Sequence, residues 1–487
     1  MAYRYGDDRK QKILFPDSID QYVCQDHPVR AYDAFVDALD LSELGIRIDK
    51  HKVGNSQYDP HLMLKLLLYG YSYGIKSSRK LERELHNNLS FIWLMKNLKP
   101  DHKTIAEFRR KNKAALKNAL KLCARLCLNL DLIQGNILFV DSTKIWANAG
   151  KAHQHDKSWY QKQLEEVDQR INKLLTECEK VDQNEAQSGS LVKMAKEFKS
   201  QKHLKETIES ALAEFSNLSE KTKNGKKRKV NRVDPQSAQM KSRQGDTHPS
   251  YAVHSVVDDQ NGLIVSIDAV NEANDSGQLA QQITNAEDNL ERECQIACTD
   301  SGYSNIEEIE KIESDKRQVI VPSQKQASDK PPGTFDKLQF SYDQDQDCYY
   351  CPKGRQLVFR RYQDKEHRLR DYRIEKPSTC KACEHFGVCT TSNAGRTVTR
   401  HVLEDLKQKV EQRYEQQDMR RIYNRRKARV EHPFGYIKKV LNFRQLSLRG
   451  RSAVQAEASI LATCFNLTRM ITIFGGVQQF INRIAVV

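Results

Sequence analysis

The stretch "ILFVDSTKIW", residues 137–146, decides how the fold is interpreted. Its first four residues, Ile137 to Val140, are apolar and are typical of a buried β-strand. Asp141 follows at once, although aspartate is rarely buried unless it is paired. We therefore expect a strand that ends at Asp141 and holds this carboxylate rigidly at the edge of a site. The alternative is that Asp141 caps the next turn together with Ser142.

The chain from residue 251 onward repeats this pattern. "YAVHSVVDDQNGLIVSIDAV" (251–270) predicts two strands joined by a turn at "DDQNG". A helix is expected at 276–290, and then "CQIACTD" (294–300) predicts a second apolar strand that ends in a carboxylate, Asp300. The helix "NIEEIEKIES" and the strand "QVIVPS" follow. The alternation predicts a mixed α/β domain with an acid at the end of two strands.

The region from 20 to 130 is expected to be helical. Thr104 and Glu107 fit a capping box at the start of the helix in "DHKTIAEFRRKN" (101–112). Upstream of it, two helices are separated by a short break, and the second carries Arg79, Lys80 and Arg83. Such a pair resembles a DNA-binding helix-turn-helix, although an ordinary helical bundle has the same pattern.

Two insertions are expected within the α/β domain. Residues 157–220 predict an antiparallel helical hairpin, with one apolar stripe on each helix. The stripes are Leu164, Ile171, Leu174, Leu175 and Cys178, and then Met194, Phe198, Leu204, Ile208, Leu212 and Phe215. The hairpin is followed by "KTKNGKKRKVNR" (221–232), which has seven basic residues and no acid. This segment is either a solvated linker or a strip that contacts phosphates.

The second insertion, about 335–395, is rich in cysteine. Cys348-x-x-Cys351 and Cys380-x-x-Cys383 have the paired spacing of a four-thiolate zinc site, and Cys389 is an alternative ligand. A structural Zn²⁺ is therefore predicted here, since the segment has few apolar residues. The alternative is a small subdomain with free thiols.

The overall charge favours a polyanionic partner. The chain of 487 residues has 79 Lys plus Arg against 64 Asp plus Glu, a formal charge of +15. Nucleic acid is the first candidate and an anionic membrane surface the second, while a merely soluble basic protein remains an alternative. The N-terminus lacks the apolar core of a signal peptide, and no run of about 18 apolar residues occurs. We expect a cytoplasmic protein that does not enter a membrane.

Two acids at strand ends suggest a shared site for Mg²⁺ or Mn²⁺. Glu431 is the candidate third acid, because it is an isolated carboxylate in the basic helix "RRIYNRRKARVEHPFGYIKK" (420–439). At about 100° per residue, Lys427 and Lys438 share its face, whereas Tyr423 is about 80° and Arg426 about 140° away. Pro433 predicts a kink after Glu431. Alternatively, Glu431 is a surface residue paired with Lys427.

The ordered set of motifs resembles the DDE transposases of bacterial insertion sequences, in particular insertion-sequence family 1182. "FVDSTKIWANAG" and "TDSGYSN" resemble the first two acidic motifs, and "YNRRKARVEHPFGYIKK" resembles the signature around the glutamate. "HPVRAYDAFVDALDLSELG", the segment 66–112, "DPQSAQMKSRQG" and "NEANDSGQL" also match in character. The resemblance covers nearly the whole chain.

The resemblance implies an RNase H-like fold in which Asp141, Asp300 and Glu431 bind the metal ions. It also implies a Tyr-Arg-Glu-Lys signature with Lys438 at its end. The chain departs from the usual spacing, because Asn424 and Lys427 stand where Tyr and Arg are expected. Tyr423 and Arg426 keep their mutual spacing one residue earlier. Together with Lys427 and Lys438, these two residues are the predicted DNA contacts of the helix.

These inferences define the predicted architecture and function. We expect a helical DNA-binding domain (1–130), an RNase H-like core (131–334 and 396–455) with the hairpin insertion, a Cys-rich insertion (335–395) and a C-terminal helical tail (456–487). The predicted activity is metal-dependent cleavage and strand transfer of double-stranded DNA, at element ends and target, by a nucleoid-associated homo-oligomer. The alternatives are a related nuclease without strand transfer and a non-catalytic DNA-binding protein.

Overall fold

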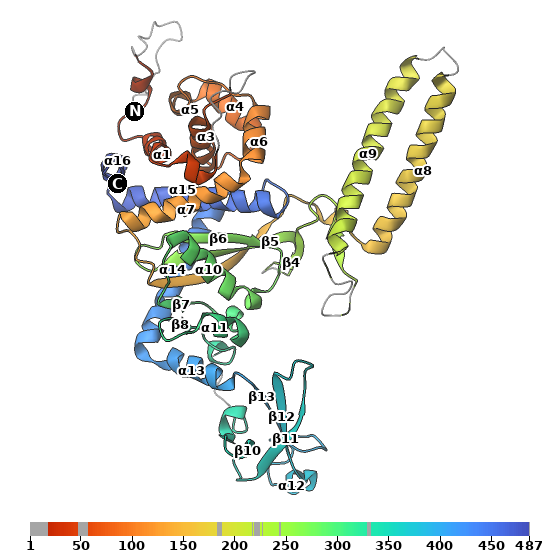
Figure 1. Cartoon of the computed structure of the whole chain (residues 1–487), viewed down its shortest axis with the longest axis vertical. Helices are drawn as coiled ribbons and strands as arrows, with labels where there is room; N and C mark the ends of the chain where they lie inside the picture. Colours follow the sequence, from red (N-terminus) through yellow and green to blue (C-terminus); the bar gives the residue numbers. More distant parts are fainter. Residues whose placement is uncertain are drawn as a thin grey trace, which may run out of the picture.

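The computed structural model describes residues 18–46, 57–182, 188–216, 218, 225, 227–242, 245–328 and 333–486. Figure 1 shows the N-terminal helices at one end of the molecule and a small β-sheet at the other. The central sheet lies between them, and a long pair of helices projects to one side.

A mixed six-stranded sheet forms the centre, in the order β4-β5-β1-β7-β8, with β6 also paired to β5. Strand β5 runs antiparallel to β1, β4 and β6, whereas β7 is parallel to both β1 and β8. The strands are β1 (Ile137–Trp146), β4 (Ala238–Lys241), β5 (Thr247–Asp258), β6 (Ile264–Val270), β7 (Ile296–Cys298) and β8 (Gln318–Ile320). The predicted strands are thus confirmed.

The prediction that the first strand ends at Asp141 is wrong. Strand β1 continues to Trp146 because each residue from Asp141 to Trp146 pairs with one of β5, from Ser255 back to Ser250. The polar residues of "DSTK" are accommodated because this half of the strand is only partly buried. Asp141 therefore lies inside a strand held by its neighbour, with no turn beginning at Ser142.

The helices that connect successive strands pack against this sheet. Helix α10 (Leu279–Leu290) connects β6 to β7, and α11 (Ile306–Ile312) connects β7 to β8. Helix α13 (Glu404–Glu415) leads into α14 (Gln417–Lys439), which packs across β1, β5 and β7. Pro433 lies inside α14, and the helix continues through it to Lys439.

The N-terminal region is helical, as predicted. Its elements are η1 (Ile19–Tyr22), α1 (Pro28–Asp37), α2 (Leu41–Leu44), α3 (Pro60–Ser72), α4 (Ser78–Asn87), α5 (Leu89–Leu94), α6 (His102–Lys111) and α7 (Lys113–Asn129). The predicted capping box is wrong: Asp101 caps α6 by accepting from Thr104 N at 2.7 Å, so Thr104 lies within the first turn. Glu107 pairs instead with Arg110 and Lys111.

The predicted C-terminal tail is instead a core helix. Helix α15 (Arg451–Ile473) packs on α7, α3 and β6, and all its residues from Ala453 to Leu467 are buried. Figure 1 shows it alongside α7, between the N-terminal helices and the sheet. Helix α16 (Val477–Ile484) packs on α1. No single helix in the described ranges is long and apolar enough to span a membrane, and α15 and α16 meet that criterion only as a pair bent by 104°.

Two polar side chains attach α15 to the edge of β6. Asn466 Oδ1 accepts from Ile264 N at 2.9 Å, and its Nδ2 donates to Ile264 O at 2.8 Å. Gln455 bonds in the same way to Ala269 N at 2.7 Å and Ile267 O at 2.6 Å. The helix thus satisfies backbone groups of a strand edge that would otherwise be unpaired.

In the region of the predicted hairpin, α8 (Lys157–Asp182) packs against α9 (Ser188–Ser216), with β2 (Gln154–Asp156) and β3 (Lys229–Asn231) at their base. Leu174 is buried, but Leu175 is 46% exposed and does not belong to the stripe. The side chain of Cys178 and much of the basic segment 221–232 lie outside the described residues.

The Cys-rich insertion is an antiparallel sheet in the order β13-β12-β11-β10-β9. Its core holds Phe340, Tyr349, Leu357, Tyr372 and Val398. The elements are β9 (Ser341–Asp343), β10 (Cys348–Tyr350), β11 (Gln356–Tyr362), β12 (Leu369–Ile374), α12 (Pro377–Lys381) and β13 (Thr397–His401). The sheet therefore extends past the predicted boundary at residue 395.

Candidate active site

Strand pairing brings Asp141 and Asp300 together. Phe139 of β1 pairs with Cys298 of β7 in parallel, and each aspartate follows its paired residue by two positions. Thr299 Oγ1 donates to Val140 O at 3.1 Å and ties the two segments just before the carboxylates. The aspartates thus occupy corresponding positions on adjacent segments, although only Asp300 lies beyond the end of its strand.

The charge on Asp141 is unfavourable in this setting. Burial raises the pKa of Asp141 to about 6, Arg426 opposes that rise, and nearby Asp300 and Asp275 add to it. Its Oδ1 accepts from Ser142 N at 2.9 Å. Desolvated carboxylates beside one another favour a bound cation. A hard divalent ion that prefers oxygen ligands therefore fits this donor set.

The structure adds a third carboxylate here that the sequence analysis missed, Asp275. It begins η3 (Asp275–Gly277), and its Oδ1 accepts from Ser142 Oγ at 2.8 Å. A Cβ added at Gly302 would lie 3.0 Å from Asp300 Oδ1 and 3.7 Å from Asp275 Oδ2, so both carboxylates adjoin this glycine. A signal was present, because Asp275 lies in "NEANDSGQL" directly after an apolar strand.

A buried histidine lies next to Asp275. His254, on β5, pairs with Ser142 in the sheet and has no solvent exposure. Its Nδ1 lies 2.7 Å from the Tyr303 hydroxyl, and its Nε2 lies 3.8 Å from Asp275 Oδ1. Burial lowers the pKa of His254 while Asp275 acts in the opposite direction. His254 and Tyr303 therefore form a buried polar support beneath the acidic site.

Helix α14 places Arg426 and Tyr423 against the aspartates. Arg426 Nη1 lies 3.9 Å from Asp141 Oδ2, and its guanidinium carbon lies 5.6 Å from the centre of the Tyr423 ring. The pKa of Tyr423 is raised by burial, opposed by Arg426 and reinforced by Asp300. Nε and Nη1 of Arg426 are buried with no hydrogen-bond partner among the described residues. This pair faces the acids despite its shifted spacing.

Glu431 is not in contact with the two aspartates. It is exposed and lines an open hollow on α14 with Asn424, Lys427, Ala428 and His432. No hydrogen bond or ion pair joins Glu431 to Asp141, Asp300 or Lys427 within the described ranges. Nor, among those residues, do three or more His, Cys, Asp or Glu side chains form a group ready to hold a metal ion.

The remaining predicted DNA contacts lie at two places. Lys438, near the end of α14, donates to Thr143 Oγ1 and to Lys144 O at 3.4 Å, next to Asp141 along β1. Arg79, Lys80 and Arg83 are all exposed on α4, where Arg83 Nη2 lies 3.7 Å from Glu84. These three cations are accessible to a phosphate backbone.

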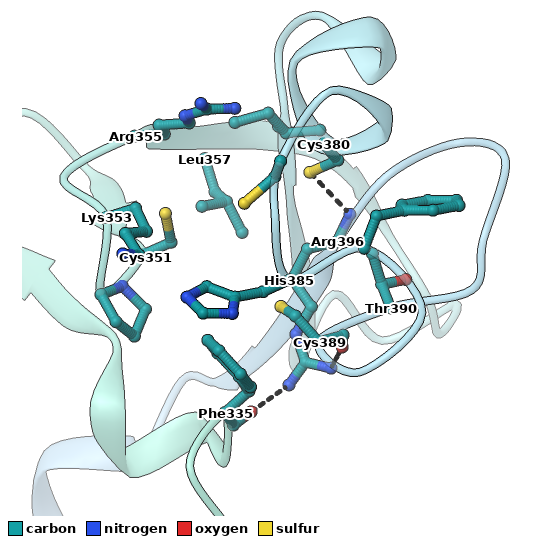
Figure 2. A pocket seen from close by; sticks show the side chains of 14 residues that line it. Phe335, Cys351, Lys353, Arg355, Leu357, Cys380, His385, Cys389, Thr390 and Arg396 are labelled. Atoms are coloured by element: carbon teal, nitrogen blue, oxygen red, sulfur yellow. Dashed lines mark hydrogen bonds between the residues drawn. The ribbon is translucent and has the colours of Figure 1, made fainter.

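The cysteines of the insertion divide into two groups. Cys351, Cys380, Cys383 and Cys389 line one pocket together with His385 (Figure 2). Cys348 is buried in β10 and does not line that pocket. The structure thus separates Cys348 from the other three predicted zinc ligands and puts Cys389 with them.

Two family models match the chain. Residues 17–111 match "Transposase domain (DUF772)", and residues 350–471 match "Transposase DDE domain". The second match includes Glu431, whereas Asp141 and Asp300 lie outside both. No curated protein matches the chain. Neither description specifies a branch of insertion sequences, so membership of family 1182 stays a prediction.

Proposed function

We propose that this chain, which belongs to the DDE transposases of insertion sequences, binds the ends of its element, cuts the DNA there and joins the freed 3′-hydroxyl to target DNA. The observation that carries the proposal is the position of Asp141 and Asp300 on adjacent segments, beside Arg426. Asp141, Asp300 and Glu431 would be the catalytic acids.

The sheet topology supports an RNase H-like core. Along β6-β5-β1-β7-β8, the first three strands alternate in direction, and β7 and β8 then continue parallel to β1. This is the mixed sheet that the DDE family implies. In this sheet, Asp141 lies on β1 and Asp300 lies just beyond the end of the neighbouring strand β7.

Mg²⁺ or Mn²⁺ is the proposed cofactor, held by Asp141, Asp300 and Glu431. When bound, the ions would activate a water or 3′-hydroxyl as the nucleophile and stabilise the leaving oxygen. The raised pKa of Asp141 supports the fit, because burial beside two other carboxylates leaves its charge poorly compensated. Asp275 is a further oxygen donor beside Asp300.

The course of α14 supports Glu431 as the third acid. Arg426, before it in the helix, reaches Asp141, and Lys438, after it, reaches Thr143. Glu431 lies between these two contacts, and seven residues at about 100° each place Lys438 only about 20° from it around the axis. Glu431 is exposed and lies about 140° around the axis from Arg426, so bound DNA and metal would have to draw its side chain toward the aspartates.

The cations around the site have roles in holding DNA. The unpaired N–H groups of Arg426 are suited to a phosphate brought next to Asp141, and Lys427 and Lys438 extend this basic surface along α14. Arg79, Lys80 and Arg83 would contact the backbone of the element end through α4. Such enzymes usually act as a dimer or larger assembly, and the projecting α8–α9 hairpin is our candidate for self-association.

The decisive test uses purified protein, DNA carrying the element's own flanking repeats, and Mg²⁺. We expect wild-type protein to nick the ends and to join them to target DNA, and Glu431→Ala to do neither while still binding. Cleavage without joining would favour the nuclease alternative. Nicking that survives Glu431→Ala unchanged would remove the proposed role of this residue.

A further inference from the structure

The pocket in the Cys-rich insertion gathers sulfur atoms from the turn after β10, from α12 and from the segment that follows α12. Cys351, Cys380, Cys383 and Cys389 all line it. Figure 2 shows the sulfurs of Cys351, Cys380 and Cys389 directed into the same space from different sides, with the His385 ring between Cys351 and Cys389. All four cysteines are free thiols of intermediate exposure, so no disulfide accounts for their convergence. Cys351 and Cys389 also pack against the hydrophobic cluster of the sheet.

Backbone hydrogen bonds fix the segments that carry these cysteines. Cys351 N donates to Arg355 O at 2.9 Å and Gly354 N to Cys351 O at 2.7 Å, in a turn where Gly354 has φ +70°. Cys383 N donates to Cys380 O at 3.1 Å. Arg396 N donates to Cys380 Sγ at 3.5 Å. The backbone N–H of Arg396 thus helps to orient the Cys380 sulfur within the pocket.

Strand geometry explains why Cys348 is not part of this group. Tyr349 pairs with Leu357 across β10 and β11, and Leu357 lines the pocket. Directly paired side chains share a face of the sheet, and successive residues alternate. Cys348 therefore points to the opposite face. Cys348 and Cys351 therefore have the Cys-x-x-Cys spacing, but their side chains do not enter the same site.

The insertion needs an additional source of stability. Its hydrophobic cluster comprises only five buried residues, and domains of this size are commonly held by a disulfide or a metal. Four thiols gathered in one pocket become favourable ligands once a cation compensates the charge of their thiolates.

We propose that Cys351, Cys380, Cys383 and Cys389 bind one structural Zn²⁺ that holds the insertion together. Four thiolates complete a closed tetrahedral site with no open catalytic position. The side chains within the described ranges are not yet arranged as ligands, so binding requires rotation of the cysteines about χ1, and of the His385 ring away from the centre. This proposal does not depend on the DNA chemistry.

The test is metal analysis of the full-length protein, with Cys348 as the matched control. Wild type and Cys348→Ser are each expected to carry about one Zn²⁺ per chain, whereas Cys351→Ser, Cys380→Ser, Cys383→Ser and Cys389→Ser lose it. Replacement by Co²⁺ should give thiolate charge-transfer absorption whose intensity corresponds to four sulfur ligands. In wild type, a protease should cut the insertion faster after the metal is chelated than before. Before chelation, the insertion of Cys348→Ser should be cut no faster than that of wild type.

Three results would overturn the proposal. The first is wild-type protein that takes up no Zn²⁺ or Co²⁺ even after reconstitution. The second is loss of zinc in Cys348→Ser to the same extent as in Cys351→Ser. The third is a Co²⁺ spectrum with fewer than four thiolates, which would assign a ligand position to His385. Because the spectrum is recorded on wild type, misfolding of a variant cannot imitate this last result.

Discussion

Arg426 Nη1 lies 3.9 Å from Asp141 Oδ2, and two of the guanidinium nitrogens have no hydrogen-bond partner among the described residues. The arginine thus provides the positive charge nearest to a carboxylate that its surroundings disfavour as an anion. The donors are buried, so a phosphate would reach them only if the side chains around them moved. In the proposed function, this side chain would connect the acidic site to bound DNA.

Replacing the two central aspartates should abolish DNA cleavage without unfolding the protein. We expect Asp141→Asn and Asp300→Asn each to lower the cleavage rate by about 10³-fold or more, because each removes a charged oxygen ligand. Gel assays of nicking would measure this. Without divalent ions, the midpoint temperature of thermal unfolding should be no lower for Asp141→Asn than for wild type. The substitution removes a buried negative charge that lies close to those of Asp300 and Asp275. Asp315→Asn, at an exposed position, should behave as wild type in both assays.

Asp275→Asn should reduce cleavage less severely. Asp275 accepts from Ser142 and lies beside Asp300, so its loss should misplace the central acids rather than remove one. We expect a decrease of about 10- to 100-fold, with DNA binding unchanged. A gel-shift assay beside the nicking assay separates the two effects. Wild-type cleavage in this variant would mean that Asp275 has no part in the site.

Lys80→Ala and Arg83→Ala should weaken binding of element-end DNA. Both residues are exposed on α4. Each lost phosphate contact should reduce the slope of log K against log salt by about 0.9. Fluorescence anisotropy over a salt series would measure the slope. Lys316→Ala, also exposed but on the distant sheet domain, is the control, and an equal change in that variant would argue against a specific role for α4.

Asn466→Leu should destabilise the whole fold. The substitution leaves Ile264 N and Ile264 O without the partners that Asn466 provides in a buried setting. At about 1–3 kcal/mol for each unsatisfied group, the free energy of unfolding should fall by about 2–6 kcal/mol. Urea unfolding followed by circular dichroism gives this value. The exposed Gln479→Leu should leave the midpoint of unfolding nearly unchanged.

Asp234→Asn should remove one source of pH dependence in stability. Burial raises the pKa of Asp234, while donors from Tyr251 at 2.9 Å and Gly450 at 3.1 Å oppose that rise. A carboxyl whose pKa is raised on folding contributes less stability as pH rises from its ordinary value through the raised one. Asparagine keeps the acceptor without the charge. The variant should therefore gain stability over wild type at pH 7 but not at pH 4, which thermal unfolding at both values would reveal.

The strands of the site could be predicted from the sequence because their consecutive apolar residues indicate a buried strand. The runs before Asp141 and Asp300 are apolar on consecutive positions, as strands covered on both faces must be. The end of β1 could not be predicted in this way, because residues 141–146 are held by backbone pairing with β5 and not by burial. Asp275 was missed because it follows its strand through a turn.

Other features depended on contacts between distant segments. Asn466 interrupts an apolar run, yet it lies inside the protein because its amide bonds to both the backbone N–H and the carbonyl of Ile264 in β6. Cys348 fits a zinc spacing, but the alternation of a strand directs it away from the other thiols. In both positions residue type was informative only after the partner was known.

The attachment of α15 to β6 has a consequence for how the protein is made. Every strand of the central sheet precedes α15 in the sequence, so the β6 edge emerges from the ribosome long before the amides that cover it. Until then the nascent chain exposes an unpaired strand edge. The central sheet is therefore expected to complete its folding only after residues 451–473 are translated, and chains truncated before that point should be prone to aggregation.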